Sequence, residues 1–101
     1  MSVTIVRYQT KPERSDENQA LIEKVFVELG ATRPAGLHYA SYRLADGVSF
    51  VHVATRDDDG APNPLAEVEA FKEFQRDIAD RCELMPDASG ASLVGSYGME
   101  R

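Results

Sequence analysis

The dipeptide Asp46-Gly47 constrains the fold more than any other feature of this chain. It lies between Leu37–Leu44 and Val48–Thr55, two runs in which β-branched and aromatic residues are frequent. A two-residue type I′ turn needs positive φ at both central positions, and Asp and Gly tolerate that conformation. The sequence therefore predicts a β-hairpin with Asp46-Gly47 as its turn.

The predicted turn also fixes the register: Arg43 faces Phe50, Ser41 faces His52, and Tyr39 faces Ala54. Since side chains alternate across a strand, Tyr39, Ser41, Arg43 and His52 share one face, and His38 lies on the other. Both faces hold large apolar or aromatic groups, whereas a sheet covered by helices on one side only should have a polar, solvent-exposed outer face. We therefore expect a second copy of the chain to cover the other face, which makes the protein a homodimer through its sheet.

The remaining elements follow from hydrophobic periodicity and from the positions of Pro and Gly. Val3–Tyr8 is typical of a strand, and the spacing of apolar residues predicts a helix over Asp16–Leu29 that begins with Ser15 or Asp16 as N-cap and ends at Gly30. A second helix should open at Asn63 or Pro64, carry Cys82 near its end and stop at Met85-Pro86-Asp87, and Ser92–Tyr97 should form the last strand. The order βαββαβ predicts one α+β domain over residues 1–101, a ferredoxin-like sandwich with two helices on one face of a four-stranded antiparallel sheet.

Charge and cysteine content limit the classes of partner and the cellular compartment expected for this chain. The formal net charge of −6 and the absence of a Lys/Arg-rich stretch argue against binding to nucleic acid or to an anionic membrane. Cys82 is the only cysteine, so we expect a packed thiol in a reducing compartment, the cytoplasm. Met1–Thr10 has no apolar core typical of a signal peptide, and no apolar run is long enough for a membrane helix.

With this element order, the chain resembles the dimeric α/β-barrel superfamily, and within it the small bacterial proteins of the antibiotic-biosynthesis-monooxygenase-like group. The resemblance covers nearly the whole chain and rests on the hairpin followed by Ser49–Val53, on Asn63-Pro64-Leu65, on Phe71-x-x-Phe74-Gln75 and on Val94–Tyr97. It implies a homodimer whose two sheets form a barrel, with a pocket between sheet and helices in each monomer. Some relatives oxidise polycyclic aromatic substrates with O₂ and without metal or flavin, and others bind or degrade haem.

The haem-degrading relatives use an Asn on the first strand and a Trp and a His on the second helix. Here the first strand has Arg7 and no Asn, the second helix has no His, and the chain has no Trp. No haem-site residue is therefore carried over. The two histidines, His38 and His52, lie on opposite faces of the hairpin, and the run Asp57-Asp58-Asp59 lacks the ligand spacing of a calcium loop, so we expect neither a metal nor another cofactor.

The polar cluster around His52 is the candidate site. His52 would act as a base that takes a proton from a phenol, and Arg43 would stabilise the resulting anion, which could react with O₂. Tyr39, Ser41 and, if its face matches, Arg7 would bind the small aromatic or quinol-like ligand. Two alternatives stay open: the cluster is a hydrogen-bonded structural group in a dimer interface, or the dimer is a non-catalytic module that binds a metabolite or supports another enzyme. The residues alone do not decide whether the protein is an enzyme.

Overall fold

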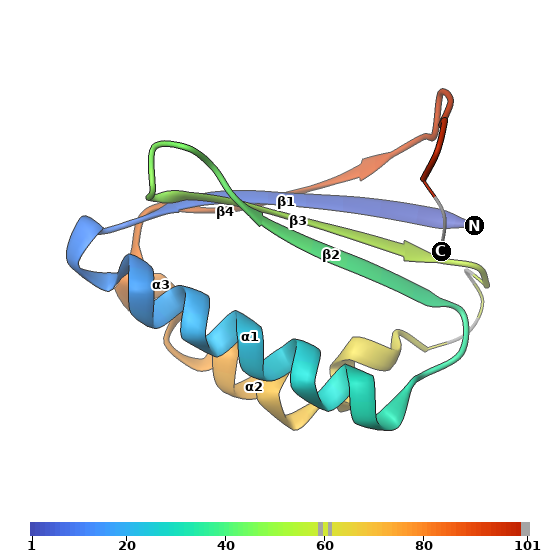
Figure 1. Ribbon diagram of the computed structural model, residues 1–101, viewed down its shortest axis with the longest axis horizontal. Coiled ribbons are helices and arrows are strands. Elements are labelled where there is room, and N and C mark those ends of the chain that lie inside the picture. Colours follow the sequence, from blue (N-terminus) through green and yellow to red (C-terminus); the bar gives the residue numbers. More distant parts are fainter. Residues whose placement is uncertain (59, 61, 100–101) are drawn as a thin grey trace.

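The computed structural model describes residues 1–58, 60 and 62–99, and its four strands form one antiparallel sheet with the order β2-β3-β1-β4. The strands are β1 (Ser2–Thr10), β2 (Leu37–Arg43), β3 (Ser49–Arg56) and β4 (Cys82–Ala91). The helices are α1 (Ser15–Thr32), α2 (Glu69–Arg76) and α3 (Ile78–Arg81), with 3₁₀ turns η1 (Pro12–Arg14) and η2 (Pro64–Glu67). All helices lie on one side of the sheet (Figure 1), which confirms the ferredoxin-like α+β fold.

The hairpin between β2 and β3 has the predicted register but a different turn. Tyr39 pairs with Ala54, Ser41 with His52, and Arg43 with Phe50, as expected. Gly47 has a φ of 78° but Asp46 does not have a positive φ, so the turn is not type I′. Instead, the Asp46 carboxylate accepts hydrogen bonds from the amides of Val48 and Ser49 and from the Ser49 hydroxyl. These bonds form an Asx-type arrangement in which, of Asp46 and Gly47, only the glycine is left-handed.

Helix α1 extends past its predicted end. Gly30 lies inside the helix, which ends at Thr32; its C-cap, Arg33, has a left-handed φ of 48° and donates its N–H to the carbonyl of Leu29. Pro34 follows and disfavours helical geometry at Arg33, which accounts for the position of the stop. The predicted caps were also wrong: the N-cap is Arg14, and Ser15 is already helical.

The last third of the chain differs most from expectation. The helix predicted to run past Cys82 and stop at Met85-Pro86-Asp87 is divided into η2, α2 and α3, and Cys82 is the first residue of β4. The strand predicted at Ser92–Tyr97 was wrong, because β4 is formed by Cys82–Ala91 instead. Within β4, Asp87 pairs with Arg7 and Leu84 with Gln9, so both Met85 and Pro86 oppose the single residue Tyr8. This bulge, on an edge strand, accommodates a proline that has no N–H to donate.

The core lies between the sheet and the helices. It is formed by Tyr8 and Phe50 from the sheet, Ile22 and Val25 from α1, Leu65, Val68 and Phe74 from the second helical segment, and Cys82. Cys82 is a free, buried thiol, as expected, and burial raises its pKa. Among the described residues, no helix is long and apolar enough to cross a membrane.

Candidate functional site

His52 lies on the helix-facing side of β3 and is only 4% exposed. Its imidazole stacks near the rings of Tyr8 and Tyr39, with ring centroids 5.3 and 5.9 Å apart, and it lies against Phe74 of α2 at 5.5 Å. The polar cluster predicted around His52 therefore faces the interior of the monomer. It does not lie on the outer face where a second copy was expected.

Two of the expected partners of His52 are in place. The Nδ1 atom of His52 lies 2.7 Å from the Tyr39 hydroxyl and 2.8 Å from the Ser41 hydroxyl. The third hydroxyl is one that the sequence analysis missed: Tyr8 Oη lies 2.8 Å from Nε2. Both ring nitrogens are thus occupied by hydroxyl groups, so no ligand atom touches a nitrogen of His52 without displacing a hydroxyl.

Burial controls the protonation of this cluster. Desolvation lowers the pKa of His52 from 6.5 to about 4, so the imidazole is neutral at pH 7 and has one N–H. Burial raises the pKa of Tyr39 to about 12, although a hydrogen bond from Ser41 opposes the shift, and it raises the pKa of Tyr8 well above its usual range. Both tyrosines therefore keep their protons at neutral pH.

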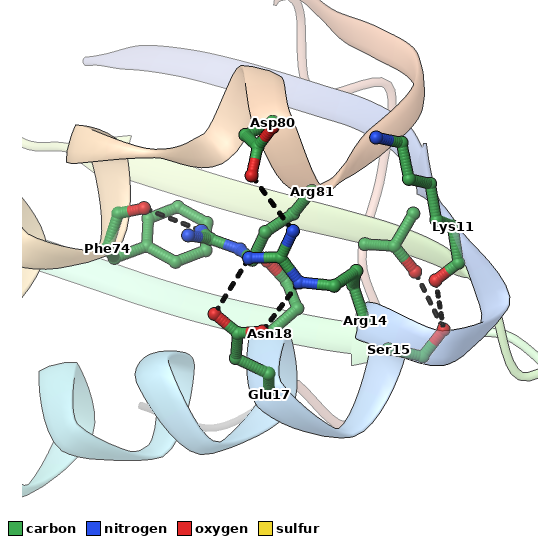
Figure 2. Close-up of polar contacts among 9 residues, drawn as sticks. Lys11, Arg14, Ser15, Glu17, Asn18, Phe74, Asp80 and Arg81 are labelled. Atoms are coloured by element: carbon green, nitrogen blue, oxygen red, sulfur yellow. Dashed lines mark hydrogen bonds and ion pairs between the residues drawn. The ribbon is translucent and has the colours of Figure 1, made fainter.

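The cluster continues into the helical layer through two further residues that the sequence analysis did not single out. The side-chain amide nitrogen of Asn18 donates to Tyr8 Oη at 2.8 Å. Arg81 Nε donates to Asn18 Oδ1 at 3.0 Å, and Arg81 Nη2 donates to the carbonyl of Phe74 at 2.6 Å, as Figure 2 shows. Asn18 is fully buried and Arg81 is 1% exposed.

A sequence signal for these two residues existed. Asn18 precedes Ile22 and Val25 at helical spacing, and Arg81 follows Phe74 and Ile78 in the same way. Each is a polar residue on the apolar stripe of a helix, which is the pattern of a buried polar group that needs a partner.

A cavity of about 200 Å³ adjoins this cluster, between the sheet and the segment from η2 to α3. Its walls include the rings of Tyr8, Tyr39, His52, Phe71 and Phe74. Polar side chains contribute elsewhere to its lining: Thr4, Arg56, Asn63 and Gln75. Aromatic walls with a few convergent polar groups are typical of a small-molecule site.

Arg43 and Arg7 do not join this cavity. The Arg43 guanidinium hydrogen-bonds Asp16 at 3.1 Å and Gln19 at 2.7 Å, and its Nε donates to the carbonyl of Gly47, so it ties the hairpin to α1. The expected role of Arg43, to stabilise an anion beside His52, is not supported by this geometry. Arg7 pairs with Val51 and Asp87, which places it on the outer face of the sheet, so the condition for its inclusion is not met.

The second histidine lies apart from the site. His38 Nε2 lies 3.2 Å from an Asp57 carboxylate oxygen on the outer side of the hairpin. Among the described residues, no group of three or more His, Cys, Asp or Glu side chains is placed to hold a metal ion. Asp59, the last residue of the acidic run, lies outside the described residues.

Comparisons with known proteins identify the fold. No protein-family model matches the sequence, and no curated protein does either. A proposed antibiotic biosynthesis monooxygenase from Nitrosomonas europaea superposes with a TM-score of 0.77 at 15% identity, over 94% of this chain and 100% of its own. Rv0793 from Mycobacterium tuberculosis superposes with a TM-score of 0.73 at 15% identity, over 96% of this chain and 98% of its own. A solved structure described as an antibiotic biosynthesis monooxygenase gives 0.73 at 19% identity, over 94% and 100%.

At these identities the likeness establishes the fold alone. It extends over almost the full length of both chains in each comparison. The chain thus has the ferredoxin-like fold of the antibiotic biosynthesis monooxygenase-like proteins, the group that its sequence resembles.

Proposed function

We propose that the protein binds a small phenol or quinol in the cavity beside His52 and oxygenates it with O₂. The observation that carries this proposal is an aromatic cavity of about 200 Å³ with the side chains of Tyr8, Tyr39 and His52 among its lining residues. A cavity of about 150 Å³ accommodates benzene, so this one suits a single substituted ring. A three-ring compound would extend beyond it.

The proposed reaction uses O₂ as the only oxidant and is written for a hydroquinone. Loss of a hydroxyl proton makes the ring electron-rich, O₂ forms a bond to a ring carbon, and the O–O bond then breaks. One oxygen atom stays in the product, a hydroxyquinone, and the other leaves as water. The ring supplies all four electrons, so no external reductant is required.

The geometry changes the role first expected for His52. Since hydroxyl groups occupy both of its nitrogens, a ligand proton would reach it through a tyrosine: Tyr8 would pass its own proton to Nε2 and take that of the ligand. A pKa of about 4 makes His52 a weak base in the empty site. A phenolate formed next to it would raise that pKa, because an opposite charge favours the imidazolium.

Oxygen uptake tests the proposal. Purified protein would be mixed with a panel of one-ring hydroquinones and catechols, with anthrone as a three-ring comparison, and O₂ consumption measured against the uncatalysed rate. We expect protein-dependent uptake with a one-ring compound. We expect Tyr39→Phe to lower kcat/KM at least tenfold, the effect of losing one strong hydrogen bond in the transition state.

Tyr42→Phe is the matched control, because Tyr42 lies on the same strand but on the outer face and is 51% exposed. It should leave uptake unchanged. Absence of protein-dependent uptake over the whole panel would overturn the oxygenase proposal.

A second candidate function is binding without turnover. It is favoured by the low basicity of His52 and by hydrogen bonding that leaves no fully buried side-chain polar atom unpartnered among the described residues. In that case a one-ring phenol would stabilise the protein against heat and bind in calorimetry, while no O₂ is consumed.

We also propose that two copies pair through the outer face of the sheet, in the cytoplasm. Ile5, Tyr42 and Leu84 are exposed large hydrophobic residues on strands, and Ile5 pairs with Val53 on this face. Pairing would remove this apolar surface from water. A reducing compartment fits a chain whose one cysteine is a buried free thiol.

A further inference from the structure

We propose that Arg81, Asn18 and Tyr8 form a one-way chain of hydrogen bonds that fixes His52 as the Nδ1–H tautomer and makes the Tyr39 hydroxyl a donor toward the cavity. The site would then select a ligand oxygen that accepts a hydrogen bond, namely a phenolate or a quinone-type carbonyl. This inference deepens the proposed function, since it concerns the ligand of the same cavity.

The direction of the chain is set at its buried end. Arginine has only donors, so Arg81 Nε, 3.0 Å away, requires the amide oxygen of Asn18. This orientation turns the amide nitrogen of Asn18 toward Tyr8 Oη at 2.8 Å, where it donates. Figure 2 shows Arg81 held between Asn18 and the Phe74 carbonyl, an arrangement that fixes the guanidinium from two sides.

Tyr8 transmits this direction to the imidazole. Because its oxygen accepts from Asn18, its single hydrogen is free for the other partner, His52 Nε2, at 2.8 Å. Nε2 must therefore be the acceptor and carry no hydrogen. A neutral imidazole has its one hydrogen on the other nitrogen, so Nδ1 is the donor.

The consequence appears at Tyr39. Nδ1 lies 2.7 Å from Tyr39 Oη and 2.8 Å from Ser41 Oγ, and neither hydroxyl can donate to a nitrogen that carries a hydrogen. With Nδ1–H as the donor, both hydroxyl oxygens are its acceptors. Tyr39 lines the cavity, and once its oxygen accepts from Nδ1 its own hydrogen can point there. That proton is therefore available to a ligand.

The positive charge of Arg81, where the series of hydrogen bonds begins, determines which kind of ligand oxygen the site prefers. Arg81 is a buried cation. In each hydrogen bond of the series the donor is the residue nearer to Arg81, so each hydrogen points away from Arg81 and toward the cavity. Aligned hydrogen bonds polarise one another in a low-dielectric interior. The positive end of the chain therefore faces the ligand, so a negatively charged oxygen is favoured over a hydroxyl that must donate. Arg81 and Asn18 act as positioning residues, because they affect the ligand only through Tyr8 and His52.

Replacing Asn18 by Asp reverses the donor-to-acceptor direction of the hydrogen bonds from Tyr8 to Tyr39, with almost no change in the shape of the side chain at position 18. The carboxylate of Asn18→Asp still accepts from Arg81 but also accepts from Tyr8, whose hydrogen then leaves His52. The Tyr8 oxygen becomes an acceptor, Nε2 takes the hydrogen, and Nδ1 becomes an acceptor for Tyr39. Tyr39 then donates to His52 and no longer to the ligand.

The experiment is a long-range ¹⁵N–¹H correlation spectrum of the full chain with ¹⁵N-labelled histidine at pH 7. The chain has only two histidines, so His38→Gln assigns the signals. We expect pyridine-type Nε2 and pyrrole-type Nδ1 in the wild-type protein, and the reverse in Asn18→Asp. Gln19→Glu makes the same chemical change at an exposed neighbouring position on α1 and should leave the His52 signals unchanged.

A hydrogen on Nε2 in the wild-type protein would overturn the proposal, as would an unchanged tautomer in folded Asn18→Asp. If Asn18→Asp does not fold, Tyr8→Phe decides: without the Tyr8 hydroxyl, the Nδ1–H preference should weaken, and an undiminished preference would refute the chain. These spectra need no ligand and no turnover, so they stand apart from the oxygen-uptake result.

The ligand preference is read with 4-nitrophenol, whose phenolate is visible by absorbance. A donor from Tyr39 should make the pKa of the bound probe lower in the wild-type protein than in Tyr39→Phe or Asn18→Asp by roughly one unit, a tenfold change in the proton equilibrium. Equal values in the three proteins would refute the donor role of Tyr39.

Discussion

His52 makes the folded protein sensitive to acid. Its pKa falls from 6.5 to about 4 on burial, so between these values the unfolded chain binds more protons than the folded one. Stability therefore rises with pH across this window and is lost as the pH falls through it. The shift of 2.5 units (6.5 − 4) amounts to about 3 kcal/mol between pH 7 and pH 4.

Urea unfolding at pH 4, 5, 6 and 7 measures this dependence. In His52→Gln, which cannot titrate, the free energy of unfolding should be lower at pH 7 but should fall much less between pH 6.5 and pH 4.5. His38→Gln is the matched control, because His38 is partly exposed on the outer face, and it should keep the wild-type slope. The same slope in His52→Gln as in the wild type would contradict the assignment.

Arg43 provides a second prediction at this scale. Its ion pair with Asp16 joins a side chain that is 29% exposed to one that is 97% exposed, and such pairs contribute less than about 1 kcal/mol. Arg43→Ala should therefore lower the free energy of unfolding only slightly, by loss of the bond to the Gly47 carbonyl and of packing on Phe50. The dissociation constant of 4-nitrophenolate, measured by titration, should change less than twofold in Arg43→Ala. A tenfold weakening would restore Arg43 to the site.

The members of the cluster differ in how visible they are in the sequence. Tyr39, Ser41 and His52 lie on adjacent strands joined by a short turn, so local register alone predicts that they meet. Asn18 and Arg81 are 63 residues apart and meet because α1 and α3 pack on the same side of the sheet. Their contact depends on the angle and depth of helix packing, which strand alternation and helical periodicity do not specify.

At the scale of elements, the position of β4 likewise does not follow from local sequence preferences. Cys82–Ala91 contains proline, aspartate and glycine and has little intrinsic preference for a strand, whereas Ser92–Tyr97 contains Leu, Val and Tyr. Pairing with the central strand β1 overrides this preference, and the bulge opposite Tyr8 accommodates Pro86. The four-residue span of α3 ends the helical layer early, so the chain reaches the sheet ten residues before the apolar segment.

Helix α2 depends on α1 for its cap. Its N-cap residue, Val68, makes no side-chain capping bond. Instead, the carboxylate of Glu28 on α1 accepts from the amides of Glu69 at 3.0 Å and Ala70 at 2.9 Å. An acidic group at this end also interacts favourably with the helix dipole. The cap joins the two helices and holds one end of the segment that lines the cavity.

Glu28→Ala should therefore lower the free energy of unfolding by about 1–2 kcal/mol, measured by urea denaturation, and speed amide hydrogen exchange in the first turn of α2. Glu23→Ala is the control, since Glu23 is exposed on the same helix and accepts a hydrogen bond from the exposed Gln19 at 3.2 Å. It should cost less than about 0.5 kcal/mol. Equal losses in the two variants would show that Glu28 acts as an ordinary surface residue.

At the scale of the whole molecule, the two sides of the sheet differ in what covers them. The helices cover one side, and the segment after β4 projects from the sheet on the other side (Figure 1). That segment carries Val94 and Tyr97, both almost fully exposed. Together with Ile5 and Tyr42, they form apolar surface that a second copy would cover in the proposed dimer.

Ile5 lies on the central strand β1 and is 37% exposed, which makes Ile5→Glu the sharpest test of this dimer. A carboxylate there would be buried without a partner in the interface, and two symmetry-related copies would repel each other, so we expect dissociation to folded monomers. Sedimentation at micromolar concentration measures the mass, and circular dichroism shows that the fold is kept. Val27→Glu is the matched control, because Val27 is 75% exposed on α1, in the helical layer and away from the proposed interface, and this variant should sediment as the wild type does. A wild-type protein that sediments as a monomer would refute the dimer, while the cavity, which is complete within one chain, would keep its proposed ligand.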